Sequence, residues 1–211
     1  MAGTITALTV QKKNKERVNI YLDGAFALAV SLNAALTLKK GQHLTDQHIA
    51  RLKYNDRLDT AYRRSLNYLS YRARTQHEVA QYLQKKETPE AIITRVIERL
   101  AAHNYLNDAE FGRAWVETRS RLNPKGKQAL RFELKRKGLG EQDITQALSD
   151  LNENTLAWQA ITKKLPQWQR LDKANFRKKL TGYLTRRGFN YQTINATLAR
   201  AWQERPPDVD P

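Results

Sequence analysis

An internal repeat of about 50 residues is the feature that most constrains how this chain folds. Apolar residues and one basic residue recur at a first offset of 51 residues and a second offset of 50. The aligned sets are Val79, Leu130 and Leu180; Leu83, Leu134 and Leu184; Ile93, Ile144 and Ile194; Ile97, Leu148 and Leu198; and Lys86, Lys137 and Arg187. Five sets in one register predict tandem copies of a unit too small to bury its apolar faces alone.

Helical periodicity divides each copy into three helices. We expect helices over residues 58–73, 76–86, 89–103, 108–122, 124–137, 141–152, 154–165, 173–187 and 191–204. Their expected starts are the Thr75/Glu78 capping box, Thr88-Pro89, Asn107, Asn123-Pro124, Asp172 and Asn190, and Gly138 and Gly188 are expected left-handed ends.

The first 50 residues follow a different pattern. Residues 18–22 and 26–30 alternate apolar and polar side chains on either side of Asp23-Gly24, which is a strong signal for a type I′ hairpin. With residues 4–10 they predict a small three-stranded antiparallel sheet, followed by short helices within 31–36 and 45–52.

The predicted fold is therefore mainly α: tandem three-helix repeats forming an elongated curved array, with a small N-terminal antiparallel β segment. The expected domains are the β segment with its short helices over 1–55, repeats over 56–104, 105–153 and 154–204, and a disordered tail over 205–211.

Charge indicates a polyanionic partner. The net charge is +16 in 211 residues, which favours nucleic acid over an anionic membrane. The longest apolar stretch, residues 25–36, is too short to span a bilayer, no secretion signal is visible, and there is no cysteine. We expect a cytoplasmic monomer that has no contact with membranes.

Basic residues also follow the repeat. They outnumber acidic residues by seven to two over 51–74, eight to two over 117–140 and nine to one over 163–187, whereas 141–153 has four acidic residues and no basic one. This segregation predicts a continuous basic face that could follow a phosphate backbone.

The predicted helix over 124–137 concentrates that charge. The segment contains only one acid, Glu133, and six basic residues: Lys125, Lys127, Arg131, Lys135, Arg136 and Lys137. On a helical wheel, Phe132 lies among cations opposite Leu130 and Leu134. Phe132 either stacks on a base or wedges against a partner, or it packs against another repeat while the cations are merely solvated.

Paired arginines recur at the loops. Arg72 and Arg74 precede the cap at Thr75, and Arg119 and Arg121 precede Asn123; Arg177, Lys178, Arg186 and Arg187 repeat the theme in the third copy. These side chains either bind phosphate beside helix N-termini or cap the carbonyl ends of the preceding helices.

Catalytic patterns are weak. The four histidines are scattered, and no glycine-rich phosphate loop or paired acids in an apolar context occur. We expect no catalytic residues, no metal site and no cofactor, and hence a protein that is not an enzyme.

Three regions of the sequence resemble a known family. Residues 105–121 (YLNDAEFGRAWVETRSR), with Gly126, Leu130 and 133–138 (ELKRKG), resemble the middle repeat of the RecX proteins, regulators of the bacterial RecA recombinase. Residues 65–83 resemble the first repeat, and 18–30 resemble an N-terminal extension of some members. Lys127 departs from the proline that relatives commonly carry there.

The resemblance implies a non-enzymatic regulator that lies in the groove of the RecA–DNA filament, contacts recombinase and DNA, and restrains filament growth or ATP hydrolysis. The residues alone leave three alternatives open. These are a stand-alone, sequence-nonspecific nucleic-acid-binding protein, a helical scaffold for acidic proteins and a helix-turn-helix transcription factor.

Overall fold

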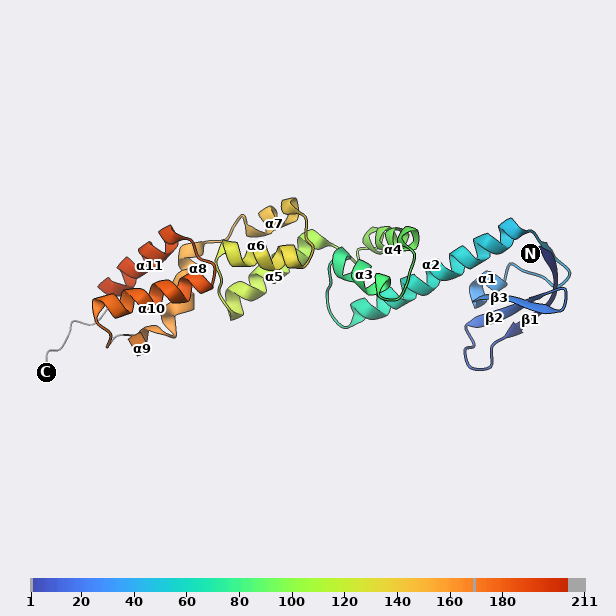
Figure 1. The fold of residues 1–211 in the computed structure, drawn as a ribbon, viewed down its shortest axis with the longest axis horizontal. Coiled ribbons are helices and arrows are strands. Elements are labelled where there is room, and N and C mark those ends of the chain that lie inside the picture. Colours follow the sequence, from blue (N-terminus) through green and yellow to red (C-terminus); the bar gives the residue numbers. More distant parts are fainter. Residues whose placement is uncertain (1, 169, 205–211) are drawn as a thin grey trace. The chain divides into compact units, whose positions relative to one another are not determined.

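The structure is a computed structural model that describes residues 2–168 and 170–204 (Figure 1). The chain forms two compact units. The first unit comprises the residues up to Arg72 together with Val79–Tyr105, and the second comprises Ala73–Glu78 and the residues from Leu106 onward. Within the described residues the protein is mainly helical with one small sheet, as predicted. The predicted tail over 205–211 lies outside the described residues.

The sheet opens the first unit. Strands β1 (Gly3–Val10), β2 (Arg17–Leu22), β3 (Ala25–Ser31) and β4 (His43–Leu44) pair antiparallel in the order β3-β2-β1-β4. Asp23 and Gly24 have φ angles of 49° and 88°, which confirms the predicted hairpin turn. The two-residue strand β4 was not predicted, because it is too short to show alternation. Helix α1 (Leu32–Ala35) follows β3 and is capped by Ser31.

Helix α2 (Asp46–Ser70) is one continuous helix of 25 residues. The sequence predicted two helices here, over 45–52 and 58–73, and that prediction is wrong. Residues 53–57 contain no glycine or proline to end the helix, and Thr45 caps its start. Arg17 of β2 also holds Asp56 in the middle of α2 through two hydrogen bonds of 3.0 and 2.9 Å.

Helices α3 (Gln76–Gln84) and α4 (Glu90–Ala102) complete the first repeat. The predicted capping box is confirmed, since Thr75 Oγ1 accepts from Glu78 N at 3.1 Å and Thr75 N donates to the Glu78 carboxylate at 3.4 Å. The predicted Thr88 cap is wrong, because Pro89 occupies the N-cap of α4 and supplies no side-chain hydrogen bond.

The second repeat contains α5 (Asp108–Leu122), α6 (Lys127–Arg136) and α7 (Glu141–Leu148). Its core consists of Val116, Leu130, Leu134, Leu139, Ile144 and Leu148. Asn107 caps α5 as predicted. Helix α7 ends four residues earlier than predicted, and Asn152 then caps the next helix, α8.

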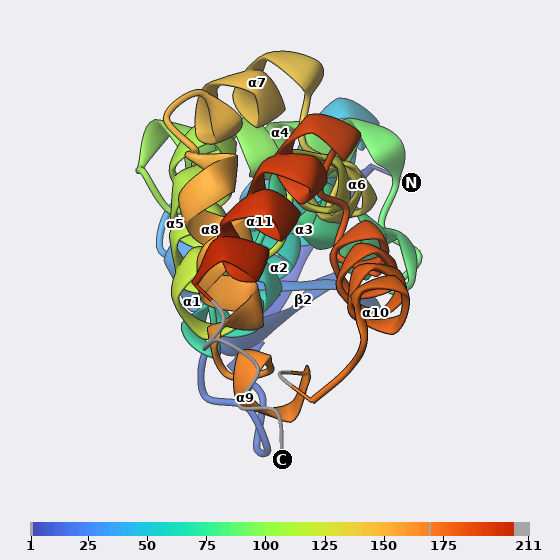
Figure 2. The same ribbon diagram turned by 90° about the vertical axis from the view of Figure 1, so that its left-hand side faces the viewer.

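The third repeat contains α8 (Glu153–Thr162), a short α9 (Leu165–Trp168), α10 (Lys173–Arg186) and α11 (Tyr191–Gln203). Figure 2 faces this end of the chain and shows α8, α10 and α11 in front. These three helices enclose a core that includes Phe176, Leu180, Leu184 and Ile194. Asp172 and Asn190 cap α10 and α11 as predicted.

The repeat alignment is confirmed by burial. The sets beginning with Val79 and Leu83 are completely buried in all three copies, and Ile93, Ile144 and Ile194 are 1–4% exposed. The left-handed ends at Gly138 (φ 82°) and Gly188 (φ 76°) are also confirmed. At the same position in the first copy stands Glu87, with φ 56°, a conformation that is costly for a residue with a side chain.

Candidate nucleic-acid and filament interface

The loop before α6 differs from its prediction. Helix α6 begins at Lys127 with Gly126 as its N-cap, whereas the sequence predicted a start at Pro124 capped by Asn123. Gly126 N donates to the carbonyl of Arg187 at 2.9 Å, and a side chain at Gly126 would overlap the backbone of Gly188. The backbone at Asn123 is therefore not helical, and the loop that follows docks on the end of α10 through Gly126.

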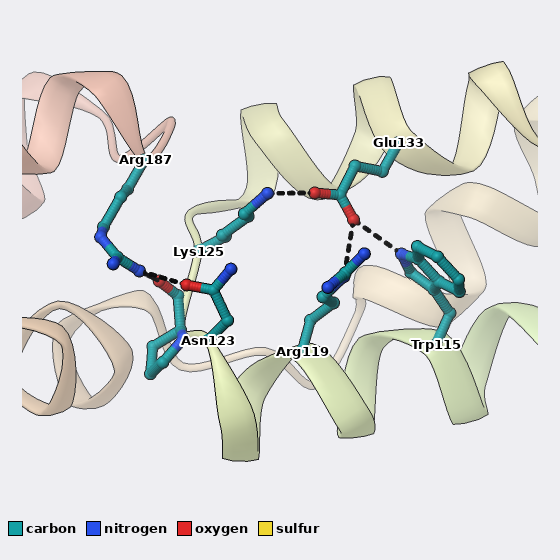
Figure 3. A network of polar contacts seen from close by, with 7 residues as sticks. Trp115, Arg119, Asn123, Lys125, Glu133 and Arg187 are labelled. Atoms are coloured by element: carbon teal, nitrogen blue, oxygen red, sulfur yellow. Dashed lines mark hydrogen bonds and ion pairs between the residues drawn. The ribbon is translucent and has the colours of Figure 1, made fainter.

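Glu133 is the centre of a polar network within the second repeat (Figure 3). Its carboxylate accepts hydrogen bonds from Trp115 Nε1 at 2.8 Å, from Arg119 Nε at 3.0 Å and from Lys125 Nζ. The Arg119 guanidinium also lies 4.5 Å from the centre of the Trp115 ring. The network ties α5, the 123–126 loop and α6 together.

Two opposing effects act on the ionisation of Glu133. Burial by itself favours the neutral acid, but the hydrogen bonds from Lys125 and Trp115 and the positive charges of Lys125 and Arg119 outweigh it. The pKa of Glu133 is therefore lowered, and the side chain is a carboxylate at neutral pH.

Arg187 makes a second set of internal contacts (Figure 3). Its guanidinium donates to Asn123 Oδ1 at 2.6 Å and to the carbonyl of Pro124 at 2.9 Å, and it lies 4.6 Å from the centre of the Tyr183 ring. Arg187 thus fastens the end of α10 to the loop before α6.

Three of the predicted binding cations are consequently engaged inside the fold: Arg119, Lys125 and Arg187. The sequence marked Glu133 as a lone acid and Asn123 as a helix cap, but it did not predict that they accept hydrogen bonds from these cations. The single acid among six cations in residues 125–137 was the available signal, because a lone carboxylate in such a field attracts the nearest cations.

The outer face of α6 is differently arranged. Phe132 is 63% exposed, and the Arg136 guanidinium lies 5.9 Å from the centre of its ring. Lys135 is exposed, and its side chain has no polar partner among the described residues. Arg131 forms an exposed ion pair with Glu141. Phe132, Lys135 and Arg136 share one helical face at i, i+3 and i+4.

The cations of α10 are also exposed. Arg177, Lys178 and Arg186 make no ion pair or hydrogen bond with the described part of the chain. Arg121 is exposed as well, at the end of α5, beside a hollow of about 600 Å³ that Arg187 and Lys163 also line. The side chains available to an anionic partner are thus those of Arg121, Arg177, Lys178 and Arg186.

The remaining predicted residues lie at connections. Arg72 is exposed and Arg74 is half-buried, between α2 and α3. The next residue, Thr75, is buried and its hydroxyl donates to the carbonyl of Lys137 at 2.7 Å. Lys127 is half-buried and its backbone N–H donates to Glu153 at 2.9 Å, so this residue also stabilises the start of α6.

Residues 2–168 and 170–204 contain neither a metal-binding cluster nor a membrane-spanning helix. In that part of the chain, no cluster of three histidine or acidic side chains is arranged to hold a metal ion. No helix there is both long enough and apolar enough to cross a membrane.

Comparison with known proteins gives a consistent picture. The family model for the regulatory protein RecX N-terminal domain matches residues 3–45, and those for the first, second and third three-helix domains of RecX match 61–100, 107–148 and 152–198. The regulatory protein RecX of Bacillus velezensis is 36% identical over 211 residues, which cover 98% of this chain and 80% of the relative. The protein of the same description from Bacillus subtilis gives the same identity and coverage.

Solved structures agree. A crystal structure of regulatory protein RecX, 29% identical, matches with a TM-score of 0.76 and covers 92% of this chain and 98% of its own. The crystal structure of RecX from Lactobacillus salivarius, 24% identical, matches in fold with a TM-score of 0.66 over 71% of this chain and 99% of its own.

Proposed function

The chain belongs to the RecX family of regulatory proteins, and we propose that it regulates the RecA recombinase by binding the RecA–DNA filament. In this proposal the bound chain inhibits filament growth, ATP hydrolysis and strand exchange. It acts as a monomer in the cytoplasm, through binding alone, without a cofactor or catalytic chemistry of its own.

One observation supports this proposal most strongly: the second unit divides its cations into two populations. Arg119, Lys125 and Arg187 are held by internal acceptors, whereas Lys135 and Arg177 are exposed and have no partner in the described residues. Like charges that repel one another and serve no internal contact are costly unless an anionic partner receives them.

The outer face of α6 combines the two chemistries needed at such a partner. Lys135 and Arg136 can neutralise phosphates, and Phe132 offers an exposed ring to a base or to an apolar side chain of the recombinase. An aromatic ring that is exposed among cations suits a surface where protein and nucleic acid meet.

The test is DNA-stimulated ATP hydrolysis by RecA with this protein titrated in. Occupancy of the same DNA by the protein, without RecA, is measured in parallel by fluorescence anisotropy at matched salt. Inhibition at concentrations that leave the naked DNA unoccupied is the expected result. No inhibition at any concentration would contradict the proposal.

A second candidate function is a stand-alone, sequence-nonspecific nucleic-acid-binding protein, and the same exposed cations favour it. It predicts that inhibition follows occupancy of the naked DNA point by point. It also predicts a steep loss of binding with salt, with a slope near −0.7 per phosphate contacted on single strands.

A further inference from the structure

The first unit contains a polar pocket of about 500 Å³ between α2 and the turn that joins α3 to α4. The pocket is distinct from the cations of α6 and α10, because every residue that lines it belongs to the first unit. Its charged lining residues are Arg17, Asp56, Arg57, Arg64, Lys86 and Glu87.

Helix α2 supplies the floor and two of the cations. Arg57, Thr60, Ala61 and Arg64 lie at i, i+3, i+4 and i+7, which places them on one face of the helix. The two small residues leave space between the two arginines. At a rise of 1.5 Å per residue, the arginine Cα atoms are about 10 Å apart along the axis, so their side chains can reach different anionic groups.

The acids of α2 are already engaged. Asp56 accepts two hydrogen bonds from Arg17, whose Nη2 also donates to the carbonyl of Ala29 at 3.0 Å. Asp59 is paired with Arg99 at 3.4 Å. The Arg17–Asp56 pair is mostly buried, with side-chain exposures of 22% and 14%, so it forms a fixed, neutral part of the wall.

Three lining cations remain without an internal acceptor. Arg57, Arg64 and Lys86 are exposed, and none of their side chains has a hydrogen bond or ion pair within the described residues. Glu87 is the one lining acid outside the Arg17–Asp56 pair in that part of the chain, so the lining has a net charge of +2. This net positive charge favours the binding of an anion in the pocket.

The opposite wall includes the connection that leads into α4. Thr88 and Pro89 line the pocket at the start of α4, whose N-cap has no side-chain hydrogen bond. The positive end of the α4 dipole adds to the potential of the three cations, although a helix start would not define a site by itself.

We infer that this pocket binds phosphate groups of a nucleic-acid backbone and gives the first unit its own contact with DNA. Arg57 and Arg64 contact separate phosphates from α2, and Lys86 contacts the backbone from the turn opposite. The contact uses the first unit only and does not require the recombinase, so its test is independent of the regulatory function proposed above.

The experiment measures binding of the full chain to a fluorescein-labelled single-stranded oligonucleotide across a range of salt concentrations. The pocket variant is Arg57→Glu with Arg64→Glu. Its matched control is Arg51→Glu with Lys53→Glu, which reverses the same charge at exposed positions of the same helix outside the pocket. We expect the pocket variant to bind about tenfold more weakly than the control, with a salt slope smaller by about 1.4 for two lost phosphate contacts.

Two measurements guard against a misfolded variant. Glu87→Gln removes the lining acid that has no side-chain partner among residues 2–168 and 170–204, and it should tighten binding, a gain that loss of structure cannot produce. In the unaltered protein, bound oligonucleotide should protect Lys86 from acetylation while leaving the neighbouring Lys85 and the more distant Lys53 reactive, as read by mass spectrometry. Equal binding by the pocket variant and its control, equal acetylation of Lys86 and Lys85, or no oligonucleotide binding by the unaltered chain at low salt would overturn the inference.

Discussion

The Arg187 guanidinium donates a hydrogen bond to Asn123 Oδ1 at 2.6 Å, across 64 positions of sequence. The sequence predicted different roles for both residues: a phosphate-binding arginine and a helix cap. The structure gives them a joint role in fastening the third repeat to the second. A cation in a basic segment can thus be structural or can be available for binding, and the presence of an internal partner decides between the two roles.

Replacing Arg187 should therefore affect stability. Arg187→Ala removes two hydrogen bonds and the contact with Tyr183, and leaves two acceptors unpaired, so we expect it to lower the free energy of unfolding by about 1–3 kcal/mol. Urea unfolding followed by circular dichroism measures this. The adjacent Arg186→Ala, at an exposed position without a partner in the described chain, should change stability by less than about 0.5 kcal/mol. Equal effects of the two variants would disprove the structural role.

Glu133 should make the second unit sensitive to acid. Because its pKa in the folded protein is lower than in the unfolded chain, its contribution is fully present above its ordinary value of 4.5 and is lost as pH falls through the lowered pKa. We expect Glu133→Gln to cost about 2 kcal/mol at neutral pH, since three donors lose a charged acceptor.

The measurement is urea unfolding of both proteins from pH 7 to about pH 3. The stability difference between unaltered protein and Glu133→Gln should shrink toward the acid end. A difference that stays constant over this range would show that the charge of Glu133 does not stabilise the fold.

Gly126 should tolerate no side chain. A Cβ there would overlap the backbone carbonyl of Gly188, which cannot move without breaking the end of α10. We expect Gly126→Ala to destabilise the protein by about 2 kcal/mol or more, as seen by thermal unfolding. Gly140→Ala is the matched control, because Gly140 is also an N-cap glycine without a side-chain hydrogen bond but has open space around it. Similar losses in the two variants would contradict the close approach.

Glu87 should be improved by glycine. It stands at φ 56° where the other repeats have Gly138 and Gly188, so Glu87→Gly should raise the free energy of unfolding by about 0.5–1 kcal/mol. Glu87→Ala removes the same charge but keeps the unfavourable conformation, and it should give no such gain. If alanine stabilised as much as glycine, the charge rather than the backbone would be responsible.

The sequence was sufficient for the features that depend on neighbouring residues. The Asp23-Gly24 turn and the Thr75 capping box are local patterns, and the structure confirms them. The repeat alignment is also confirmed, because it rests on a recurring order of apolar residues and not on which residues touch. The N-caps at Asp172 and Asn190 are local in the same sense.

Features that depend on distant residues were not predictable in this way. The late start of α6 follows from the docking of Gly126 on Arg187 and Gly188, more than 60 positions away. The continuity of α2 is supported by Arg17, 39 positions from Asp56. The candidate interface has the same limit: charge alone indicated the basic segments, but only the contacts made by Glu133, Asn123 and Pro124 separate internal cations from available ones.

Phe132 should matter for binding and not for folding. Because its side chain is 63% exposed, Phe132→Ala should change the free energy of unfolding by less than about 0.5 kcal/mol. The same variant should weaken inhibition of RecA. Tyr191→Ala removes a 73% exposed aromatic from α11 and serves as the control, which should leave inhibition intact. Loss of inhibition in both variants would point to a general effect of surface aromatics.

The central claim is that the exposed cations of α6 act on the filament, and one measurement tests it most directly. DNA-stimulated ATP hydrolysis by RecA is titrated with the unaltered chain, with Lys135→Glu plus Arg136→Glu, and with Lys12→Glu plus Lys13→Glu, an exposed pair of cations in the first unit. With unchanged helicity in all three proteins, the account predicts that only the α6 variant loses inhibition. Full inhibition by the α6 variant would contradict it.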